Sequence, residues 1–480
     1  MRSHNDFRDA CQLKIFMDLM RGLVQKQLQE KREVDKKLTE IVEHQFLSGM
    51  IKYTITVAIC SLAALFVMHT CGQLEILMAL TDNMVNEMEE KQLDRKLALI
   101  VEHQIRMRNL LGIWPETEPT FLKKFSLILG CYFILACELI PTILYIVLIE
   151  KRLNVRMKLV SSIMFTILAV LKYSSLVLSK NQVRNCLTHV KDDWQNVSTT
   201  SARNSMIDKA RTARRLLILC GISMYTTGLY YRTVVPLSRG KSVNDQNVTI
   251  RHLPNPSYFV LFNGQISPAY EIVFFIQFLA GMIKYTITVA ICSLAALFVM
   301  HTCGQLEILK ALTNNMVNEM EEKQLDKKLA LIVEHQIRIR NFIRLAQSTL
   351  ENTSLFEVMG CTIILCFVGH LFITDWATQD VIYMFSYLTF LLTITFNIYI
   401  FCFIGEQLSV ERERLALTVC TLDWYRFPNA KARSLVLVIA MSIVPTKIKA
   451  GKFFDLTIRT FGDVVKTAVT YMNFIRKVME

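Results

Sequence analysis

The length of its apolar runs most constrains what this chain can fold into. Residues 381–405 read VIYMFSYLTFLLTITFNIYIFCFIG, 25 residues without a charge, and residues 125–148 form a second run of 24. A helix needs about 20 apolar residues to cross the roughly 30 Å hydrocarbon core of a bilayer. Inside that core it satisfies its own backbone hydrogen bonds. The chain has 480 residues, 52% of them hydrophobic, and is predicted to be a multi-spanning helical membrane protein.

Seven such segments follow residue 111. In chain order they are 125–148, 157–178, 214–235, 269–303, 358–376, 381–405 and 453–475. The predicted fold class is therefore all-α, a polytopic membrane protein with seven transmembrane helices. The fourth segment has 35 residues, about 52 Å as a helix, and is expected to protrude beyond the bilayer. Lys158 and Lys172 lie near the ends of the second segment, where their amines are expected to snorkel to the interface.

Loop charges orient these segments, because cytoplasmic loops carry an excess of Lys and Arg. Loop 180–215 holds eight basic residues against three acidic ones, and loop 406–452 holds eight against four. Loop 375–380 has two acids and no base. This pattern predicts an intracellular N-terminal side and an extracellular C-terminus, although the basic loop 149–156 argues against it. Seven spans in this orientation are the reverse of a G-protein-coupled receptor, so no G protein is expected as a partner.

The sequence offers little for catalysis or cofactor binding. The RGKS at 239–242 lacks a phosphate-loop glycine, because Val235 stands where that glycine is needed. No H-E-x-x-H occurs, and the thirteen cysteines form no C-x-x-C pair and are assigned to packing. The net charge of +13 is explained by positive-inside loops rather than by nucleic acid binding. We therefore predict no enzyme, no cofactor, no metal and no nucleic acid partner, and one outward-facing glycosylation sequon at Asn247.

The last segment carries a polar stripe at spacings of 4, 4, 3 and 4, which is one face of an α-helix. Its members are Asp455, Arg459, Asp463, Lys466 and Thr470. Charges within a span are costly and normally face a partner or a water-filled cavity. Several copies of this helix around an axis would line an ion path, with the apolar Val469 as a dewetting gate. Alternatively, the first three residues form i,i+4 pairs in a cytoplasmic continuation of the helix.

Aromatic and Met side chains gather in the predicted outer halves of the middle segments. They are Met164, Phe165, Met224, Tyr230, Tyr231, Tyr270, Phe274, Phe275, Tyr383 and Tyr387. A pocket between helices that accepts small apolar molecules needs walls of this kind and a few hydroxyls. Packing and interfacial belts use the same residue types, so both interpretations stay open.

The chain also contains a near-identical repeat. Residues 46–109 match residues 278–341 over 64 positions. The five differences are Ser48/Ala280, Met78/Lys310, Asp82/Asn314, Arg95/Lys327 and Met107/Ile339. Ancient structural repeats drift, and solenoids need several units. We therefore interpret residues 1–109 as an extra N-terminal helical segment that duplicates part of the fourth helix, a gene-model or duplication artefact.

Several short motifs carry a resemblance to a known family. They are LLGIWPETE (110–118), LPNPSYF (253–259), SPAYEIVFFIQ (267–277), Gly405-Glu406, Trp424-Tyr425, Pro445, Ala450-Gly451, Phe453-Phe454, Thr460-Phe461, the stretch 464–467 and Tyr471. From about residue 110 to 476, the chain resembles the insect odorant receptors of the tuning type. Residues 1–109 have no counterpart in that family, and Lys452 and Asp455 depart from its pattern at the inner mouth.

The resemblance implies an odorant-gated, non-selective cation channel subunit that works in a heterotetramer with a shared co-receptor. It implies a plasma-membrane protein of olfactory sensory neuron dendrites, surrounded by lipid and activated by a small volatile apolar ligand. Helices one to six (110–403) would hold the ligand among the aromatic residues above. The region 404–452 would anchor the subunits, with Trp424, Tyr425, Pro445, Phe453 and Phe454 at or beside it. Helix seven (453–480) would line the pore with Asp463, Lys466, Val469, Thr470 and Tyr471.

Three alternatives compete with this assignment. A gustatory-type chemoreceptor channel shares the architecture, but the 110–118 and 253–259 motifs favour the odorant branch. The N-terminal graft leaves open a non-functional pseudogene product. A transporter would be expected to show inverted repeats with broken helices in both halves, whereas the repeat here is parallel and confined to one helix with its extension.

Overall fold

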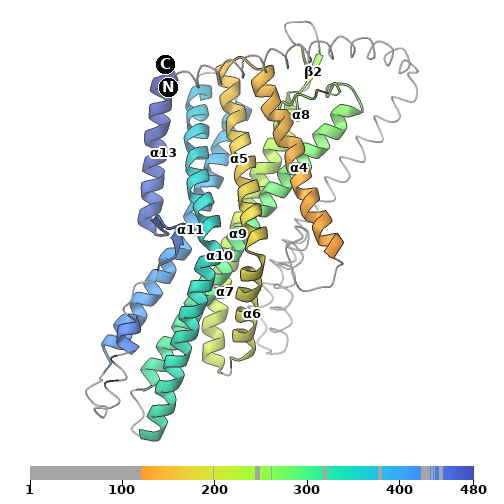
Figure 1. Cartoon of the computed structure of the whole chain (residues 1–480). Helices are drawn as coiled ribbons and strands as arrows, with labels where there is room; N and C mark the ends of the chain where they lie inside the picture. Colours follow the sequence, from red (N-terminus) through yellow and green to blue (C-terminus); the bar gives the residue numbers. More distant parts are fainter. Residues whose placement is uncertain are drawn as a thin grey trace, which may run out of the picture. The chain divides into compact units, whose positions relative to one another are not determined.

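The computed structural model is predominantly helical over the residues that it describes (Figure 1). These are 121–197, 199–239, 241–243, 249–260, 262–316, 322–376, 381–422, 433, 436, 438–442 and 447–479. Residues 1–109, Asn247, Trp424, Tyr425 and Pro445 lie outside the described residues, so the predictions made for them remain predictions.

The helices carry the labels of Figure 1. In chain order they are α4 (Phe121–Leu148), α5 (Leu153–Leu178), α6 (Lys180–Gln195), α7 (Thr200–Leu229), the π-helical turn η1 (Tyr230–Val234), α8 (Val235–Ser238), α9 (Ala269–Met316), α10 (Glu322–Trp376), α11 (Val381–Cys420) and α13 (Ile458–Met479). Two antiparallel hairpins complete the described elements. They pair β1 (Lys241–Val243) with β2 (Thr249–Arg251), and β3 (Lys449–Ala450) with β4 (Phe454–Asp455).

The all-α membrane prediction is confirmed. Among the described residues, α4, α5, α9, α10 and α11 are long and apolar enough to cross a membrane. The third predicted segment is formed by α7 with η1 and the start of α8, and α13 covers the seventh from Ile458 onward. The arrangement is that of a multi-pass membrane protein, in which the backbone polar groups are satisfied within the helices.

Several helices extend beyond the predicted spans. The predicted loop 180–215 is wrong, because it contains α6 and the first turns of α7. Likewise, α11 continues to Cys420, well into the predicted loop 406–452. The reason lies in helical spacing: α6 buries Val183, Cys186 and Val190, which recur every three to four residues between its charges. The charge counts that oriented the loops do not detect this amphipathic face.

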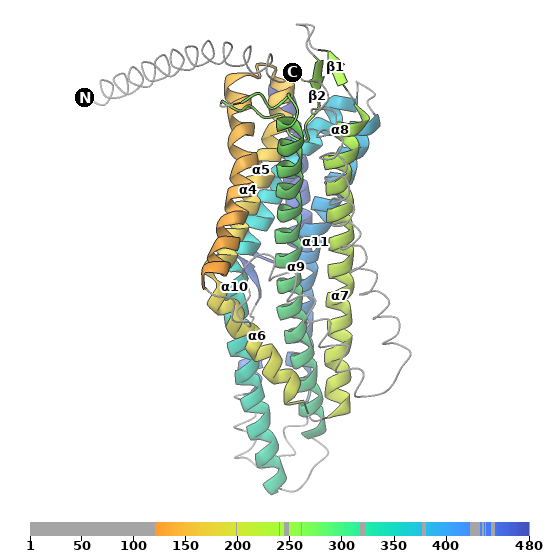
Figure 2. The same ribbon diagram turned by 90° about the vertical axis from the view of Figure 1, so that its right-hand side faces the viewer.

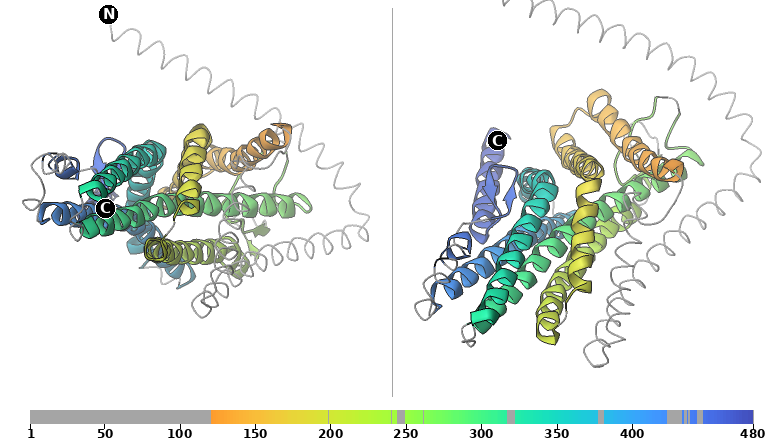
Figure 3. Two further views of the ribbon diagram at one scale, coloured as in Figure 1. Left: turned by 90° about the horizontal axis from the view of Figure 1, so that it is seen from below. Right: turned by 60° about the horizontal axis from the view of Figure 1, so that its bottom comes forward.

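Helix α9 is the central element of the bundle. It runs between α4, α5 and α10 on one side and α7 on the other (Figures 2 and 3). In its most apolar stretch 89% of the residues are buried, against 22% in α4, which therefore presents far more of its surface outward. The predicted fourth segment is confirmed as one long helix. It continues beyond residue 303 to Met316.

The expectation that Lys172 reaches the membrane interface is wrong, whereas the Lys158 side chain is 31% exposed near the start of α5. Lys172 is 1% exposed and forms an ion pair with Glu357 of α10. Lys158 pairs with Asp375 near the end of α10, 2.5 Å from its carboxylate. For Lys172, a carboxylate on the neighbouring helix α10 therefore replaces the interface as its partner.

Two charged clusters fix the predicted cytoplasmic ends of the helices. Asp193 of α6 lies 2.9 Å from His301, 3.2 Å from His189 and 2.6 Å from Arg338. Burial alone would raise the pKa of Asp193, but the contacts with His189 and His301 outweigh it and hold the pKa well below its usual value. This carboxylate therefore stays ionised at neutral pH and ties α6 to α9 and α10.

The second cytoplasmic cluster joins α7 to α11. Lys209 donates to Glu411 at 2.8 Å and lies 3.7 Å from Glu307. Burial alone would lower the pKa of Lys209, but the hydrogen bond and charge of Glu411 raise it above its ordinary value. The lysine is thus a permanent cation between the two helices.

Candidate functional site

An aromatic cluster lies where α5, α7, α9 and α11 meet. The Phe165 ring packs edge-on against Phe390, with centroids 5.7 Å apart, and lies 6.2 Å from Tyr285. Tyr225 packs edge-on against the other side of Tyr285 at 6.4 Å. Gly228 makes this possible, because a Cβ there would lie 2.2 Å from the Tyr285 ring. A glycine on α7 therefore lets an α9 aromatic ring lie directly on the helix backbone.

The predicted pocket residues fall into several groups. Phe165, Met224 and Tyr387 are buried, whereas Met164, Tyr230, Tyr231, Tyr270, Phe274, Phe275 and Tyr383 are half-buried. Tyr383 and Tyr387 stack on each other at 6.1 Å, and Tyr230 packs on Phe385 at 5.1 Å. Tyr270 lies in the first turn of α9. Of the predicted set, the ring contacts centre on Phe165, Tyr230 and the Tyr383–Tyr387 pair.

Sequence reasoning missed Tyr225, Tyr285 and Phe390, which complete the walls around Phe165. A helical-face count could have found one of them, since Phe390 lies one turn beyond Tyr387 on the same face. The nearby hydroxyls are paired with each other. Tyr225 and Thr286 lie 2.9 Å apart, as do Thr227 and Thr393. The cluster thus offers mainly apolar ring surface, with its neighbouring hydroxyls already paired.

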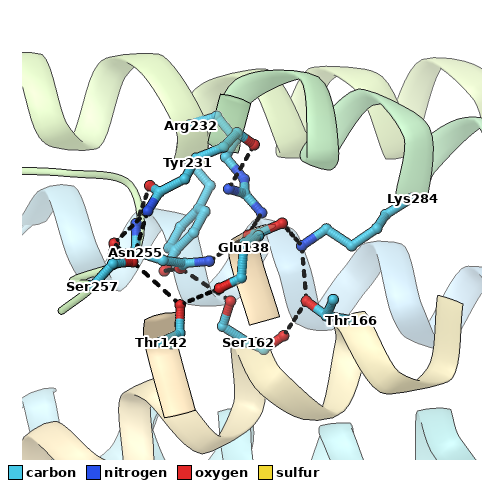
Figure 4. Close-up of polar contacts among 10 residues, drawn as sticks. Glu138, Thr142, Ser162, Thr166, Tyr231, Arg232, Asn255, Ser257 and Lys284 are labelled. Atoms are coloured by element: carbon cyan, nitrogen blue, oxygen red, sulfur yellow. Dashed lines mark hydrogen bonds and ion pairs between the residues drawn. The ribbon is translucent and has the colours of Figure 1, made fainter. Parts of the chain in front are cut away.

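A buried charged network lies next to this cluster (Figure 4). Glu138 of α4 accepts hydrogen bonds from the Arg232 guanidinium and the Asn255 amide, each at 2.5 Å. Its second oxygen lies 2.9 Å from the Lys284 amine, which donates to Thr166 at 3.0 Å. Glu138, Arg232 and Lys284 are each at most 3% exposed. One carboxylate therefore joins α4, η1 and α9, and Lys284 extends the network to α5.

The same network holds the 253–258 loop, which belongs to the LPNPSYF motif. Asn255 and Gln277 exchange two hydrogen bonds of 3.1 and 2.8 Å through the Asn255 backbone and the Gln277 amide. The Gln277 amide also donates to Ser257 at 2.8 Å, and the Tyr258 N–H donates to the Pro141 carbonyl at 3.0 Å. Sequence reasoning did not single out Glu138, Arg232 or Lys284. The available signal was their position as charges inside predicted spans.

Cationic side chains surround Tyr383 at the predicted outer end of the bundle. The Lys158 amine, already paired with Asp375, lies 5.1 Å from the centre of the Tyr383 ring. The Arg239 guanidinium lies 4.1 Å from the same ring. Cations over an aromatic face are attracted by its quadrupole. Tyr383, a predicted pocket residue, is therefore held by contacts with α5 and with the chain just after α8.

Helix α13 packs on α10 and α11 with one edge only. Val464 and Ala468 are buried against the bundle, and the Phe461 ring meets Tyr399 of α11 edge-on at 5.6 Å. The predicted pore residues share one property, exposure away from this bundle. They are Asp463, Lys466, Val469, Thr470 and Tyr471. A polar face is thereby left for another partner or for water.

The predicted helical stripe is wrong at its first member. Asp455 lies in β4 rather than in the helix and pairs with Lys447 at 3.1 Å. The hairpin that contains it docks on α10, where Lys449 and Gln347 exchange hydrogen bonds of 2.9 and 3.1 Å. Gly451 turns the hairpin with a φ of 61°, in the region that favours glycine. The chain therefore changes direction at this hairpin, and α13 begins at Ile458.

The Gly405-Glu406 pair of α11 fixes the start of α13. A Cβ at Gly405 would lie 2.2 Å from the Leu456 carbonyl oxygen, so α11 and this backbone touch where only glycine fits. The Glu406 carboxylate accepts the Ile458 N–H at 3.2 Å, which satisfies one free donor of the first turn. Phe453 and Phe454, predicted as anchor residues, are exposed on the same hairpin.

Comparisons with known proteins agree with this architecture. The family model described as 7tm Odorant receptor matches residues 153–469. Odorant receptor 82a of Drosophila melanogaster is 22% identical over 323 residues, which cover 66% of this chain and 83% of that protein. Odorant receptor 10 of Aedes albopictus is 19% identical over 321 residues, covering 65% and 81%.

A solved structure shares the fold. The insect olfactory receptor OR5 from Machilis hrabei, in complex with eugenol, superimposes with a TM-score of 0.64 at 12% sequence identity. The match covers 78% of this chain and 98% of that one. At this identity the likeness concerns the fold alone, whereas the family model spans well over half of the chain. The predicted family is confirmed: this chain belongs to the 7tm odorant receptor family.

Proposed function

We propose that this chain is the odorant-tuning subunit of a ligand-gated, non-selective cation channel. The observation that carries the proposal is the one-sided packing of α13, which buries Val464 and Ala468 and leaves Asp463, Lys466 and Thr470 exposed. Charges at membrane depth need a partner or water. Copies of this helix from several subunits around an axis meet that need. Family membership favours assembly with a shared co-receptor in a heterotetramer.

The ligand in this proposal is a small, apolar volatile that binds among Phe165, Tyr285, Phe390 and Tyr225. These rings line the junction of four helices, and their hydroxyl neighbours are already paired. A ligand opens the channel only if it binds the open state more tightly than the closed state, since equal affinity shifts nothing. The walls must therefore differ in spacing between the two states.

Whole-cell recording tests the proposal directly. Cells express the full chain, or residues 109–480, with and without an insect odorant co-receptor, and receive a panel of volatile esters, alcohols, ketones and phenols that includes eugenol. We expect the receptor to reach the plasma membrane of the expressing cell. Odour-evoked cation current is expected only when the co-receptor is present. Silence of both versions at confirmed surface expression would contradict the channel function. If residues 109–480 with the co-receptor give the same current as the full chain, the N-terminal copy has no role in gating.

Lys466 tests the placement of the pore. If it lines a cation path, Lys466→Glu replaces a repulsive charge with an attractive one and is expected to raise single-channel cation conductance about twofold or more. The matched control is Lys151→Glu, the same change at an exposed lysine between α4 and α5, with conductance unchanged. Equal conductances in wild type and Lys466→Glu would place this face of α13 against lipid instead.

A further inference from the structure

A second buried charge cluster lies deeper in the bundle, away from the network around Glu138. The Glu357 carboxylate of α10 forms an ion pair with Lys172 of α5 and accepts a hydrogen bond from the Asn397 amide of α11. Cys361 donates to the same carboxylate at 3.1 Å, and Cys220 of α7 donates to the Asn397 carbonyl at 3.8 Å. Side chains from α5, α10 and α11 thus converge on one carboxylate, and α7 joins the cluster through Asn397.

Stability alone is a weak reason for this cluster. Lys172, Glu357 and Asn397 are each at most 1% exposed. Burying an ion pair costs about as much desolvation as it returns in attraction, and well-packed apolar residues of similar volume often serve as well or better. What a paired buried carboxylate does provide is geometry: it fixes which helices face one another and at what distance.

The cluster lies directly below the proposed pocket on the same two helices. Phe165 precedes Lys172 on α5 by seven residues, and Phe390 precedes Asn397 on α11 by seven. Seven residues are about two turns, or roughly 10 Å, and return to the same helix face. Phe165 and Phe390 pack edge-on at 5.7 Å where the ligand is proposed to bind. A ligand between these rings would push α5 and α11 apart. Glu357 contacts both helices and therefore holds them together just below that place.

The cluster also leads to the pore helix. Tyr399 follows Asn397 by two residues, which places the two side chains about 200° apart around α11. Asn397 faces Glu357, and Tyr399 packs on Phe461 of α13. A rotation of α11 that changes the contact between Asn397 and Glu357 must therefore also move the Tyr399 ring, which packs on α13.

We infer that Glu357 is a positioning residue for gating: through Asn397 it holds α11 against the α5–α10 pair, so that ligand-driven separation of Phe165 and Phe390 is transmitted to α13. This inference rests on the proposed channel function. Coupling between the ligand site and α13 requires an element with two arrangements whose equilibrium both sites shift. In this inference, α11 is that element.

Asn397→Leu tests the link, because it removes the hydrogen bond to Glu357 at nearly constant volume and leaves the Lys172 ion pair in place. In the receptor with its co-receptor, we expect the maximal current per surface receptor to fall at least fivefold, the lower end of measured couplings. The rank order of agonists, eugenol and the rest of the panel included, is expected to stay the same, because the pocket walls are untouched.

The matched control is Tyr132→Phe, which removes the 2.8 Å hydrogen bond between Tyr132 of α4 and Ser174 of α5 without touching α11. Current per surface receptor is expected to be unchanged in this variant. If Asn397→Leu only lowers the number of surface receptors, each still giving wild-type maximal current and EC50, Glu357 is structural and the inference is overturned.

Hydrogen exchange provides a readout that needs no ligand. In the purified complex with co-receptor, Asn397→Leu is expected to speed amide exchange across 458–479 several-fold relative to Tyr132→Phe. Wild-type exchange there would overturn the inference. A wild-type receptor that is silent across the whole panel would instead count against the proposed function, so the two failures are distinguishable.

Discussion

Gly405→Ala is expected to abolish odour-evoked current while leaving much of the receptor at the cell surface. The new methyl would lie 2.2 Å from the Leu456 carbonyl oxygen, a backbone atom that cannot rotate away. Relief requires the 456–458 segment to move off α11, which breaks the Glu406 hydrogen bond to the Ile458 N–H. Overpacking of this kind costs about 1–3 kcal/mol. Since 1.4 kcal/mol is a factor of ten, a cost of this size shifts the gating equilibrium by a factor of about 5 to 140.

The matched control is Gly221→Ala. Gly221 is also a buried glycine in a helix, but nothing lies within 4 Å of the position its Cβ would take. Alanine is favoured over glycine in a helix by about 1 kcal/mol, so this variant is expected to match or exceed wild-type stability. Current is normalised to surface-labelled receptor in both variants. Wild-type current from Gly405→Ala would show that the contact between α11 and the start of α13 is not needed for gating.

The spans were predictable because they depend on composition alone. The uncharged run of α11 and the apolar run of α4 exceed the length that a bilayer requires, whatever packs against them. The helical segments outside the spans were not predictable in the same way. In α6 a narrow apolar stripe of Val183, Cys186 and Val190 is interrupted by many charges, and charge counting hides it.

The aromatic cluster around Phe165 was predictable only in part from the sequence. Phe165 was found from the sequence, whereas its partners Tyr285 and Phe390 lie on α9 and α11. Their contact depends on which faces of three helices meet. In a uniformly apolar helix, the sequence does not show which face packs inward. The Gly405-Glu406 motif likewise signalled the family, but its role depends on the chain returning from β4 to touch α11.

Buried charges illustrate the same limit. Glu138, Arg232 and Lys284 are far apart in sequence, and each alone is an anomaly within an apolar segment. Their pairing follows from the approach of α4, η1 and α9. Once paired, one carboxylate serves two cations, so each member of the network depends on the others. Of the three charged groups, the carboxylate contributes most to stability, because its loss leaves both cations without a counter-charge.

Glu138→Gln is therefore expected to remove most receptor from the cell surface. Leaving a buried cation unpaired costs about 3–5 kcal/mol, and this change affects Arg232 and Lys284 together. A loss of only about 1–2 kcal/mol changes cellular abundance several-fold, so a surface level at least tenfold below wild type is expected. Surface biotinylation measures it. The control is Asp208→Asn, in an exposed pair with Arg211 worth at most about 1 kcal/mol, with no loss expected.

The double variant Glu138→Gln with Lys284→Met separates a charge effect from a shape effect. It keeps the amide beside Arg232, whose guanidinium still donates to the Gln277 carbonyl at 3.0 Å, and removes the second unpaired cation. Partial recovery of surface receptor is expected, because only one buried charge then lacks its partner. If the double variant is as depleted as Glu138→Gln alone, the unpaired amine is not the cause. Wild-type surface levels in Glu138→Gln would mean that the Gln277 carbonyl and the Thr166 hydroxyl suffice for both cations, and that the carboxylate does not hold α4 to the bundle.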